Sequence, residues 1–455
     1  MWGQGRLADN ARVGEGTAAV GGPGALGAVS SVYLCMEVAG CPTVCRHCWA
    51  QGLGYGVMPL ADVERVLEAA HRFCDGAGLA FDAYPMHEMA AHPDAARLFA
   101  LFNAYGVPAC GGTRFEPLTT TGVPLAVRED WREVLRAAAD TGTVNLWVAL
   151  HGLGEVHDRQ VNRGGAYAET CLAIQRARSA GLSVGGNIFL TAASLAQIDE
   201  LTAVRRRLPV NAALCFAVAG FLPTPRSRRN EQLRPVLPDL LPHAARVGEL
   251  SAPITRRWWA SLEEQTEAAY VRRALAGDWP AEPERPAGEL ALVCRPDLSV
   301  YSGLAGLYRT RYGNVRADGA AAVLGRALAH GLRADDALWF AGLDPLPGRA
   351  ELAARYGDAT GLGVHPGPES VRYLWLDRAR RRAREHRSGS ADPDGSPGWS
   401  RRTRPGPGPS PGLLALAADA GPLAALGGQD VGVAGVGVSP AQVVLQLAAS
   451  TAWLG

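Results

Sequence analysis

Cys41-Pro-Thr-Val-Cys45-Arg-His-Cys48 follows closely on a short apolar run, Val32 to Met36, and these two stretches decide the fold. Three cysteines lie within eight residues. A loop of this length can fold around one face of a cubic 4Fe-4S cluster so that each thiolate binds a different iron, whereas an electron-transfer cluster normally takes a fourth cysteine. We therefore expect Cys41, Cys45 and Cys48 to hold a 4Fe-4S cluster with one iron left open for chemistry.

The spacing resembles that of the radical S-adenosylmethionine (SAM) superfamily, whose mark is Cys-x3-Cys-x2-Cys after a first apolar strand. An aromatic or similar residue precedes the last cysteine in that superfamily, which makes His47 a SAM contact. The resemblance implies that SAM chelates the open iron through its amino and carboxylate groups. An electron from the cluster then cleaves the sulfonium to methionine and a 5'-deoxyadenosyl radical, so the cofactors carry the chemistry. It further implies a radical SAM enzyme that abstracts hydrogen from an unidentified peptide or small-molecule substrate, with a flavodoxin or ferredoxin as reductant.

Two other interpretations of the cysteine run stay open. One is a zinc knuckle, although zinc normally takes a fourth Cys or His at a similar local spacing. His47 is the nearby candidate, yet its neighbour Cys48 leaves it little freedom to reach the same metal. The other is a non-catalytic scaffold or binding protein that keeps an iron-sulfur cluster for structure or redox sensing.

The composition is that of a globular protein with a large core. The chain has 455 residues, of which 47% are hydrophobic and 20% charged, and this length predicts two or three domains. A formal net charge of +1 gives no global field to attract nucleic acid or a membrane surface, so we predict neither as a partner. Nine cysteines, an odd number, follow a start without a charged-then-apolar signal pattern, which indicates the reducing cytoplasm. The nearest candidate for a membrane span, 413–454, is interrupted by Gly, Pro, Asp and Gln, so we predict no transmembrane segment.

From Ser30 onward, short β-rich apolar runs alternate with amphipathic helical patterns, which is typical of βα units and a parallel sheet. About six such units are too few to close an eight-stranded barrel. We therefore predict an α/β fold with an open, partial TIM-like (β/α)6 barrel, whose chemistry sits at the carboxyl ends of the strands. The expected strands are 31–37, 78–84, 107–110 with 116–120, 144–150, 183–190 and 211–218, and the expected helices are 60–74, 93–105, 129–140, 166–180 and 194–207.

The chain is expected to divide into five parts. Residues 1–29 form an N-terminal segment, 30–234 the radical SAM core domain and 235–387 a C-terminal α+β extension. Residues 388–412 are dense in Ser, Gly, Pro and Arg and cannot bury enough apolar area to order themselves, which predicts a disordered linker. Residues 413–455 are expected to form a C-terminal tail, either flexible or folded into a small docking element.

The predicted extension resembles the one that follows the core in peptide-modifying radical SAM enzymes. Residues 297–303 and 311–315 are similar to its strand pair and Gly-Asn turn. Cys294 is the only cysteine beyond the predicted core, and one cysteine cannot hold a second cluster.

Glu88 stands at the end of the second predicted strand. The superfamily has a Gly-Gly-Glu type of turn there, whose carboxylate grips the amino group of SAM, so the resemblance makes Glu88 a SAM contact. A charge-assisted contact of this kind is strong in a dry site. Met86 and His87 replace the glycines that allow close backbone approach. The alternative is that Glu88 faces solvent.

Further polar positions follow or occupy the third, fourth and fifth predicted strands. Thr121 and Gly122 resemble the Thr-Asn-Gly type of turn after the superfamily's third strand, where glycine supplies backbone freedom. His151 stands where the superfamily often has an acid, which makes it a candidate contact of SAM or substrate, with a hydrogen-bonded strand-end histidine as the alternative. Asn187 is a polar amide in an apolar strand, which costs free energy unless its hydrogen bonds are met. A ribose hydroxyl of SAM would meet them, and a core amide is the alternative.

Overall fold

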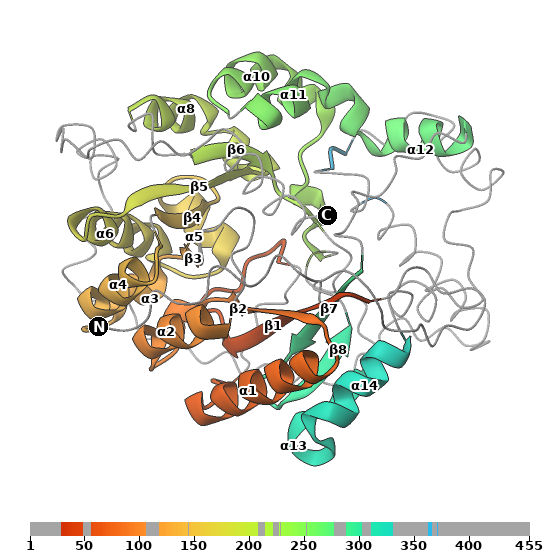
Figure 1. Cartoon of the computed structure of the whole chain (residues 1–455). Coiled ribbons are helices and arrows are strands. Elements are labelled where there is room, and N and C mark those ends of the chain that lie inside the picture. Colours follow the sequence, from red (N-terminus) through yellow and green to blue (C-terminus); the bar gives the residue numbers. More distant parts are fainter. Residues whose placement is uncertain are drawn as a thin grey trace, which may run out of the picture.

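The computed structural model describes residues 29–48, 56–105, 118–143, 145–207, 214–221, 227, 229–251, 253–276, 288–302, 311–330, 363–365 and 371. Within these ranges, parallel strands alternate with helices that lie on their outer side (Figure 1). The predictions for residues 1–28, 107–117 and 388–455 fall outside the described residues.

The first sheet has five strands in the order β2-β1-β7-β8-β9. Strand β1 (Ser31–Ala39) pairs in parallel with β2 (Ala80–His87) on one edge and with β7 (Glu289–Cys294) on the other. Strands β8 (Ser299–Ser302) and β9 (Arg311–Asn314) continue the sheet in antiparallel fashion. The cysteine run therefore leaves a strand that is hydrogen-bonded along both edges.

The second sheet has four parallel strands in the order β3-β4-β5-β6. These are β3 (Leu118–Thr120), β4 (Asn145–Leu150), β5 (Ser183–Leu190) and β6 (Leu214–Val218). A Cβ atom on Gly185 would lie 2.7 Å from Cε3 of Trp147, so the glycine leaves room for that indole between the two strands.

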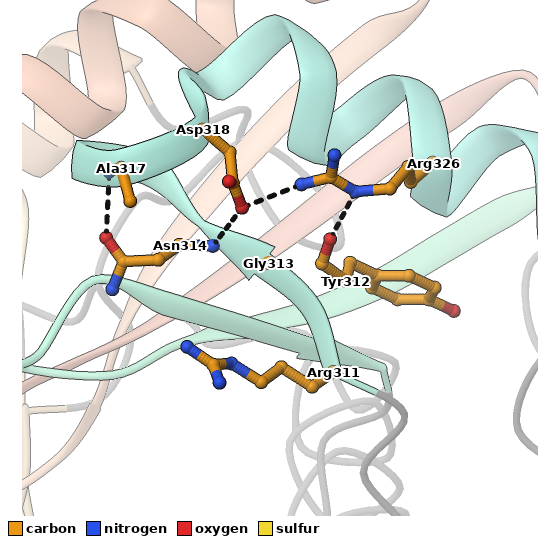
Figure 2. A pocket seen from close by; sticks show the side chains of 7 residues that line it. All are labelled: Arg311, Tyr312, Gly313, Asn314, Ala317, Asp318 and Arg326. Carbon is orange, nitrogen blue, oxygen red and sulfur yellow. Dashed lines mark hydrogen bonds and ion pairs between the residues drawn. The ribbon is translucent and has the colours of Figure 1, made fainter.

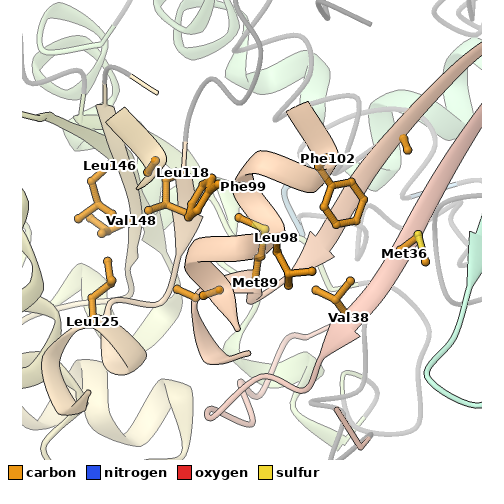
Figure 3. Packing of buried hydrophobic residues seen from close by; sticks show 14 of the residues in the cluster. Met36, Val38, Met89, Leu98, Phe99, Phe102, Leu118, Leu125, Leu146 and Val148 are labelled. Carbon is orange, nitrogen blue, oxygen red and sulfur yellow. The ribbon is translucent and has the colours of Figure 1, made fainter. Parts of the chain in front are cut away.

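Helix α2 (Ala95–Tyr105) joins the two sheets through their common core. Phe99 lies beside Leu118 of β3, and Leu98 and Phe102 extend toward Met36 and Val38 of β1 (Figure 3). All six side chains are at most 4% exposed. Burial of this continuous apolar cluster holds the open barrel together, because no strand pairing between β2 and β3 is found in the described part of the chain.

The remaining helices pack around this framework (Figure 1). Helix α14 lies against α1, where Arg316 at the start of the α13–α14 pair donates to the Asp62 carboxylate at 2.7 Å. None of the described helices is long and apolar enough to cross a bilayer. Their bounds are α1 (Leu60–Gly76), α3 (Val123–Val127), α4 (Trp131–Asp140), α5 (Glu155–Val161), α6 (Ala166–Ser179), α7 (Ala192–Leu195), α8 (Ile198–Arg207), α10 (Leu237–Glu249), α11 (Pro253–Ala260), α12 (Glu267–Ala276), α13 (Val315–Asp318) and α14 (Ala320–His330).

The predicted α/β fold with an open parallel barrel is confirmed, and most predicted elements are found within two or three residues of their expected bounds. The predicted helix at 194–207 is instead two helices, α7 and α8, because Thr191 caps a short first helix through a reciprocal bond with Ser194. The addition of β7 to the free edge of β1 was not expected from the sequence. The division into five parts stays a prediction.

Candidate functional site

The three cysteines lie on one loop at the carboxyl end of β1, the edge where parallel α/β sheets carry their sites. The Thr43 hydroxyl lies between two of them, 3.1 Å from Cys41 Sγ and 3.6 Å from Cys45 Sγ. Cys45 also packs against Val161 and Ala166, which fixes the middle of the loop on an apolar surface. The loop is therefore held by contacts that involve no metal.

Burial, with a smaller contribution from the Glu88 carboxylate, raises the pKa of the Cys41 thiol to about 12. Burial also raises the pKa of Cys45 well above its usual range, with the neighbouring Cys48 and Cys41 adding to the shift. Among the described residues, no group of three Cys, His, Asp or Glu side chains converges as the ligands of a single ion. A cubic cluster takes each thiolate on a different iron, so it needs sulfurs that are spread apart.

Glu88 lies at the end of β2 and is 2% exposed, so the alternative of a solvent-facing carboxylate is wrong. The backbone N–H of Thr121 donates to Glu88 Oε2 at 2.6 Å, whereas the buried Oε1 has no hydrogen-bond partner among the described residues. Burial raises the pKa of Glu88, although its contacts with Thr120 and Thr121 act in the opposite direction. The charge of Glu88 also raises the pKa of Cys41, so the carboxylate acts electrostatically on the cysteine loop.

Gly122 begins α3 in the left-handed region, with a φ of +84°. A Cβ atom there would lie 2.9 Å from the Thr170 Cα, so the predicted need for glycine is met by both conformation and space. The Thr170 hydroxyl donates to the Thr121 carbonyl at 2.8 Å. Together these contacts fix the backbone N–H that holds Glu88, while the buried Thr121 hydroxyl has no hydrogen-bond partner within the described ranges.

His47 and His151 meet in a buried aromatic cluster, with ring centroids 4.6 Å apart. His151 stacks on Phe189 of β5 at 5.2 Å, and Phe221 presents its ring to His47 at 6.1 Å. Burial lowers the pKa of His47 to about 4 and holds the pKa of His151 well below its ordinary value, which His47 and His157 lower further. Both rings are therefore neutral at pH 7.

His151 lies just after β4, and neither of its two predicted roles is tested by its contacts. Its backbone N–H donates to His157 Nδ1 at 3.1 Å, as for a strand-end histidine, but its own buried Nδ1 has no partner in the described part of the chain. Asn187 is 8% exposed and lies on the same face of β5 as Phe189, opposite Ala149 of β4. The roles of both residues stay predictions.

The structure thus gathers the loop, Glu88, Thr121, Gly122, His47 and His151 at one end of the barrel. Sequence reasoning missed Gln160 in α5, whose side-chain N–H donates to His47 Nδ1 at 3.0 Å. Nothing in the local pattern around Gln160 indicates this contact, since the two residues are 113 positions apart.

Arg234 is a second residue that the sequence did not reveal. Its guanidinium donates to the Phe221 carbonyl at 2.9 Å and to His365 Nδ1 at 3.1 Å, and it lies over the Phe221 ring at 5.3 Å. Gly363 leaves room for it, because a Cβ atom there would lie 2.9 Å from the Arg234 Cδ. Arg234 thereby connects a segment late in the chain with the aromatic cluster around His47.

A cavity of about 420 Å³ lies elsewhere, between β9 and α14 (Figure 2). Its charged groups are already paired with the protein: Arg326 donates to the Tyr312 carbonyl and to the Asp318 carboxylate, which also accepts from the Asn314 N–H. These bonds stabilise the turn from β9 into α13, so the charged groups that line the cavity have a structural role.

No protein-family model matches the chain, and no curated protein matches it. Solved structures with similar chain paths include anSMEcpe with bound AdoMet, at 13% identity and a TM-score of 0.43 over 85% of this chain and 98% of that chain. SuiB from Streptococcus suis has 13% identity and a TM-score of 0.39 over 68% of this chain and 69% of its own. Coproporphyrinogen III oxidase (HemN) from Escherichia coli, described as a radical SAM enzyme, has 13% identity and a TM-score of 0.34 over 77% and 90%.

Proposed function

We propose that the chain is a radical SAM enzyme in which Cys41, Cys45 and Cys48 hold a 4Fe-4S cluster and SAM binds the open iron. The observation that carries this proposal is the unpartnered Oε1 of a buried carboxylate, Glu88, next to the three-cysteine loop. An unsatisfied buried acceptor costs free energy until a donor reaches it. The amino group of SAM, which keeps its N–H donors when it coordinates iron, would be such a donor.

The residues present fit the cluster and SAM. The loop offers three thiols on a backbone that is fixed by other contacts, and no fourth cysteine lies in the Cys41 to Cys48 run. When bound, the cluster supplies the electron that cleaves SAM and generates the radical for hydrogen abstraction. The chain's own groups would have other tasks: Thr121 orients Glu88, Glu88 accepts from the amino group of SAM, and Asn187 offers its amide to a ribose hydroxyl. The neutral rings of His47 and His151 keep the region dry, which limits side reactions of a radical.

The same features weigh against the zinc knuckle. A structural zinc ion needs four ligands within about 2.3 Å of one point, usually all from Cys and His. His47 Nδ1 is engaged by Gln160, and no three suitable side chains in the described ranges surround a common point. The scaffold alternative keeps the cluster but leaves the unpartnered Glu88 oxygen without a purpose.

The remaining partners are also proposals. We expect a flavodoxin or ferredoxin as reductant and a peptide or small molecule as substrate. The eight cysteines of the described residues are all free thiols, which supports a reducing cytoplasmic location.

Anaerobic reconstitution with iron and sulfide, followed by dithionite and SAM, tests the proposal. We expect a brown protein with about four irons per chain and formation of 5'-deoxyadenosine and methionine. The matched control is C45S, which removes one thiolate and should abolish both products. A cluster without 5'-deoxyadenosine would favour the scaffold, and a colourless protein with one bound zinc would favour the knuckle.

A further inference from the structure

The cysteine loop is docked on the C-terminal end of α5. The N–H of Val44 donates to the Val161 carbonyl and the N–H of Arg46 to the Gln160 carbonyl, each at 2.9 Å. The last carbonyls of a helix have no partner within the helix, so they are free to accept from another segment. Asn162 ends α5 with a φ of +54°, which turns the chain away and leaves these carbonyls open to the loop.

The Gln160 side chain adds a third bond, which acts on His47. Both side chains are buried, at 2% and 9% exposure, so the 3.0 Å bond between Gln160 Nε2 and His47 Nδ1 is shielded from water. An amide NH₂ group only donates, so Nδ1 must be the unprotonated nitrogen of the ring. Because Nδ1 accepts this bond, the ring carries its proton on Nε2, the nitrogen directed away from Gln160.

We infer that Gln160 is a positioning residue for cofactor binding: it holds His47 in the Nε2–H form, so that the imidazole offers a hydrogen-bond donor to the bound ligand. The inference rests on the proposed function, in which that ligand is SAM. The ligand atom that His47 meets is therefore an acceptor, such as a ring nitrogen of the adenine or a ribose oxygen. Without Gln160 the ring would rotate and exchange tautomers, and the donor would be present only part of the time.

The test uses the full chain reconstituted anaerobically with its cluster, and measures SAM binding by equilibrium dialysis. Gln160→Leu keeps the bulk of the side chain but removes the donor. We expect it to weaken SAM binding about tenfold, the effect of one lost buried hydrogen bond, with unchanged iron content because all three thiolates remain. The matched control is Arg159→Gln on the exposed side of the same helix, where the replaced side chain is 60% exposed and pairs with the exposed Glu155. It should leave SAM affinity unchanged.

A double-mutant cycle separates positioning from a merely structural role. If Gln160 acts through His47, Gln160→Leu should have little further effect in a His47→Phe background, because interacting residues are not additive. An equal loss of affinity in both backgrounds, or no loss in either, would overturn the inference.

Nitrogen NMR of the metal-free chain with ¹⁵N-labelled histidine gives a readout that does not need SAM, with His47→Phe used to assign the signal. We expect an unprotonated Nδ1 for His47 in the wild type and a mixture of tautomers in Gln160→Leu. A protonated Nδ1 in the wild type would refute the inference whatever the cluster does. Absence of SAM cleavage together with the expected NMR result would refute the proposed function alone.

Discussion

At the scale of single residues, Glu88 has two oxygens in different states. Oε2 accepts the Thr121 N–H, while Oε1 is buried without a described partner. Burial raises the pKa of Glu88 because the charged form loses its water. In the proposed enzyme, SAM would pair with this carboxylate and offset its cost to the stability of the metal-free protein.

Glu88→Gln tests this trade-off between stability and binding. The pKa of Glu88 is higher in the folded than in the unfolded chain, so the folded chain binds more protons between these two pKa values. The wild type therefore loses stability as pH rises from the unfolded pKa through the folded pKa. Glutamine is neutral and escapes this loss. We expect an unfolding temperature at pH 7.5 no lower than that of the wild type, but SAM binding at least about tenfold weaker.

Calorimetry of the metal-free variant and equilibrium dialysis of the reconstituted one measure the two effects. The control is Glu155→Gln, which changes a carboxylate with an 89% exposed side chain and should alter neither property. Unchanged SAM affinity in Glu88→Gln would contradict the assigned contact.

The raised pKa of the Cys41 thiol predicts an unusual pH dependence of its alkylation by iodoacetamide. Because burial raises the pKa of Cys41 to about 12, its thiolate fraction in the metal-free chain should rise about tenfold per pH unit from pH 8 to pH 10. A thiol with the ordinary pKa of about 8.5 levels off in that range. Iodoacetamide labelling followed by mass spectrometry, with the urea-unfolded chain as control, measures both slopes. A plateau near pH 9 for folded Cys41 would contradict the shift.

At the scale of elements, the start of α3 connects two parts of the site. Gly122 needs both its positive φ and the space beside Thr170, and it fixes the turn that presents the Thr121 N–H to Glu88. The turn is therefore sensitive to a single methyl group.

Gly122→Ala and Gly78→Ala form a matched pair for this element. Gly78 also has a positive φ, of +68°, but a Cβ atom there would meet nothing within 4 Å. We expect Gly78→Ala to lower the free energy of unfolding by about 1 kcal/mol from backbone strain alone. Gly122→Ala should cost about 3 kcal/mol, because the Cβ must also displace Thr170. Urea unfolding measures both, and equal costs would show that the contact with Thr170 is relieved.

The sequence predicts an element or contact well when the residues involved are close together in the chain, and poorly when they are far apart. Glu88 and Thr121 each end a βα unit, so the rule that strand ends meet at one edge was enough to bring them together. The helices with clear apolar periodicity were also predictable, because that periodicity lies within each segment. The contacts of Gln160 with His47 and of Arg234 with His365 join residues more than 100 positions apart. A local sequence pattern cannot predict contacts of this range.

At the scale of the whole molecule, late parts of the chain complete the early ones. Strand β7 covers the second edge of β1. Residues 363–365 lie beside Pro235 and Gln265, and His365 Nδ1 accepts a hydrogen bond from Arg234. Apolar β1 would otherwise expose an unpaired edge, which invites aggregation. The predicted boundary between core and extension is therefore crossed by a sheet.

Arg234→Leu tests how much this closure contributes. The side chain of Arg234 is 5% exposed, so its loss leaves the Phe221 carbonyl and His365 without their buried donor. We expect the free energy of unfolding to fall by about 3 kcal/mol. The control is Arg246→Leu, which removes a pair with the 79% exposed Asp199 side chain and should cost less than about 1 kcal/mol. Urea unfolding of the two variants makes the comparison, and equal losses would show that Arg234 has no special role.

The docking of the cysteine loop on α5 has a consequence for repair after oxygen damage. Because helix carbonyls accept from the N–H groups of Val44 and Arg46, the loop would keep its path if oxidation removed the iron of the proposed cluster. Refilling then requires delivery of iron and sulfide and release of thiol protons, but no renewed search for the loop's conformation.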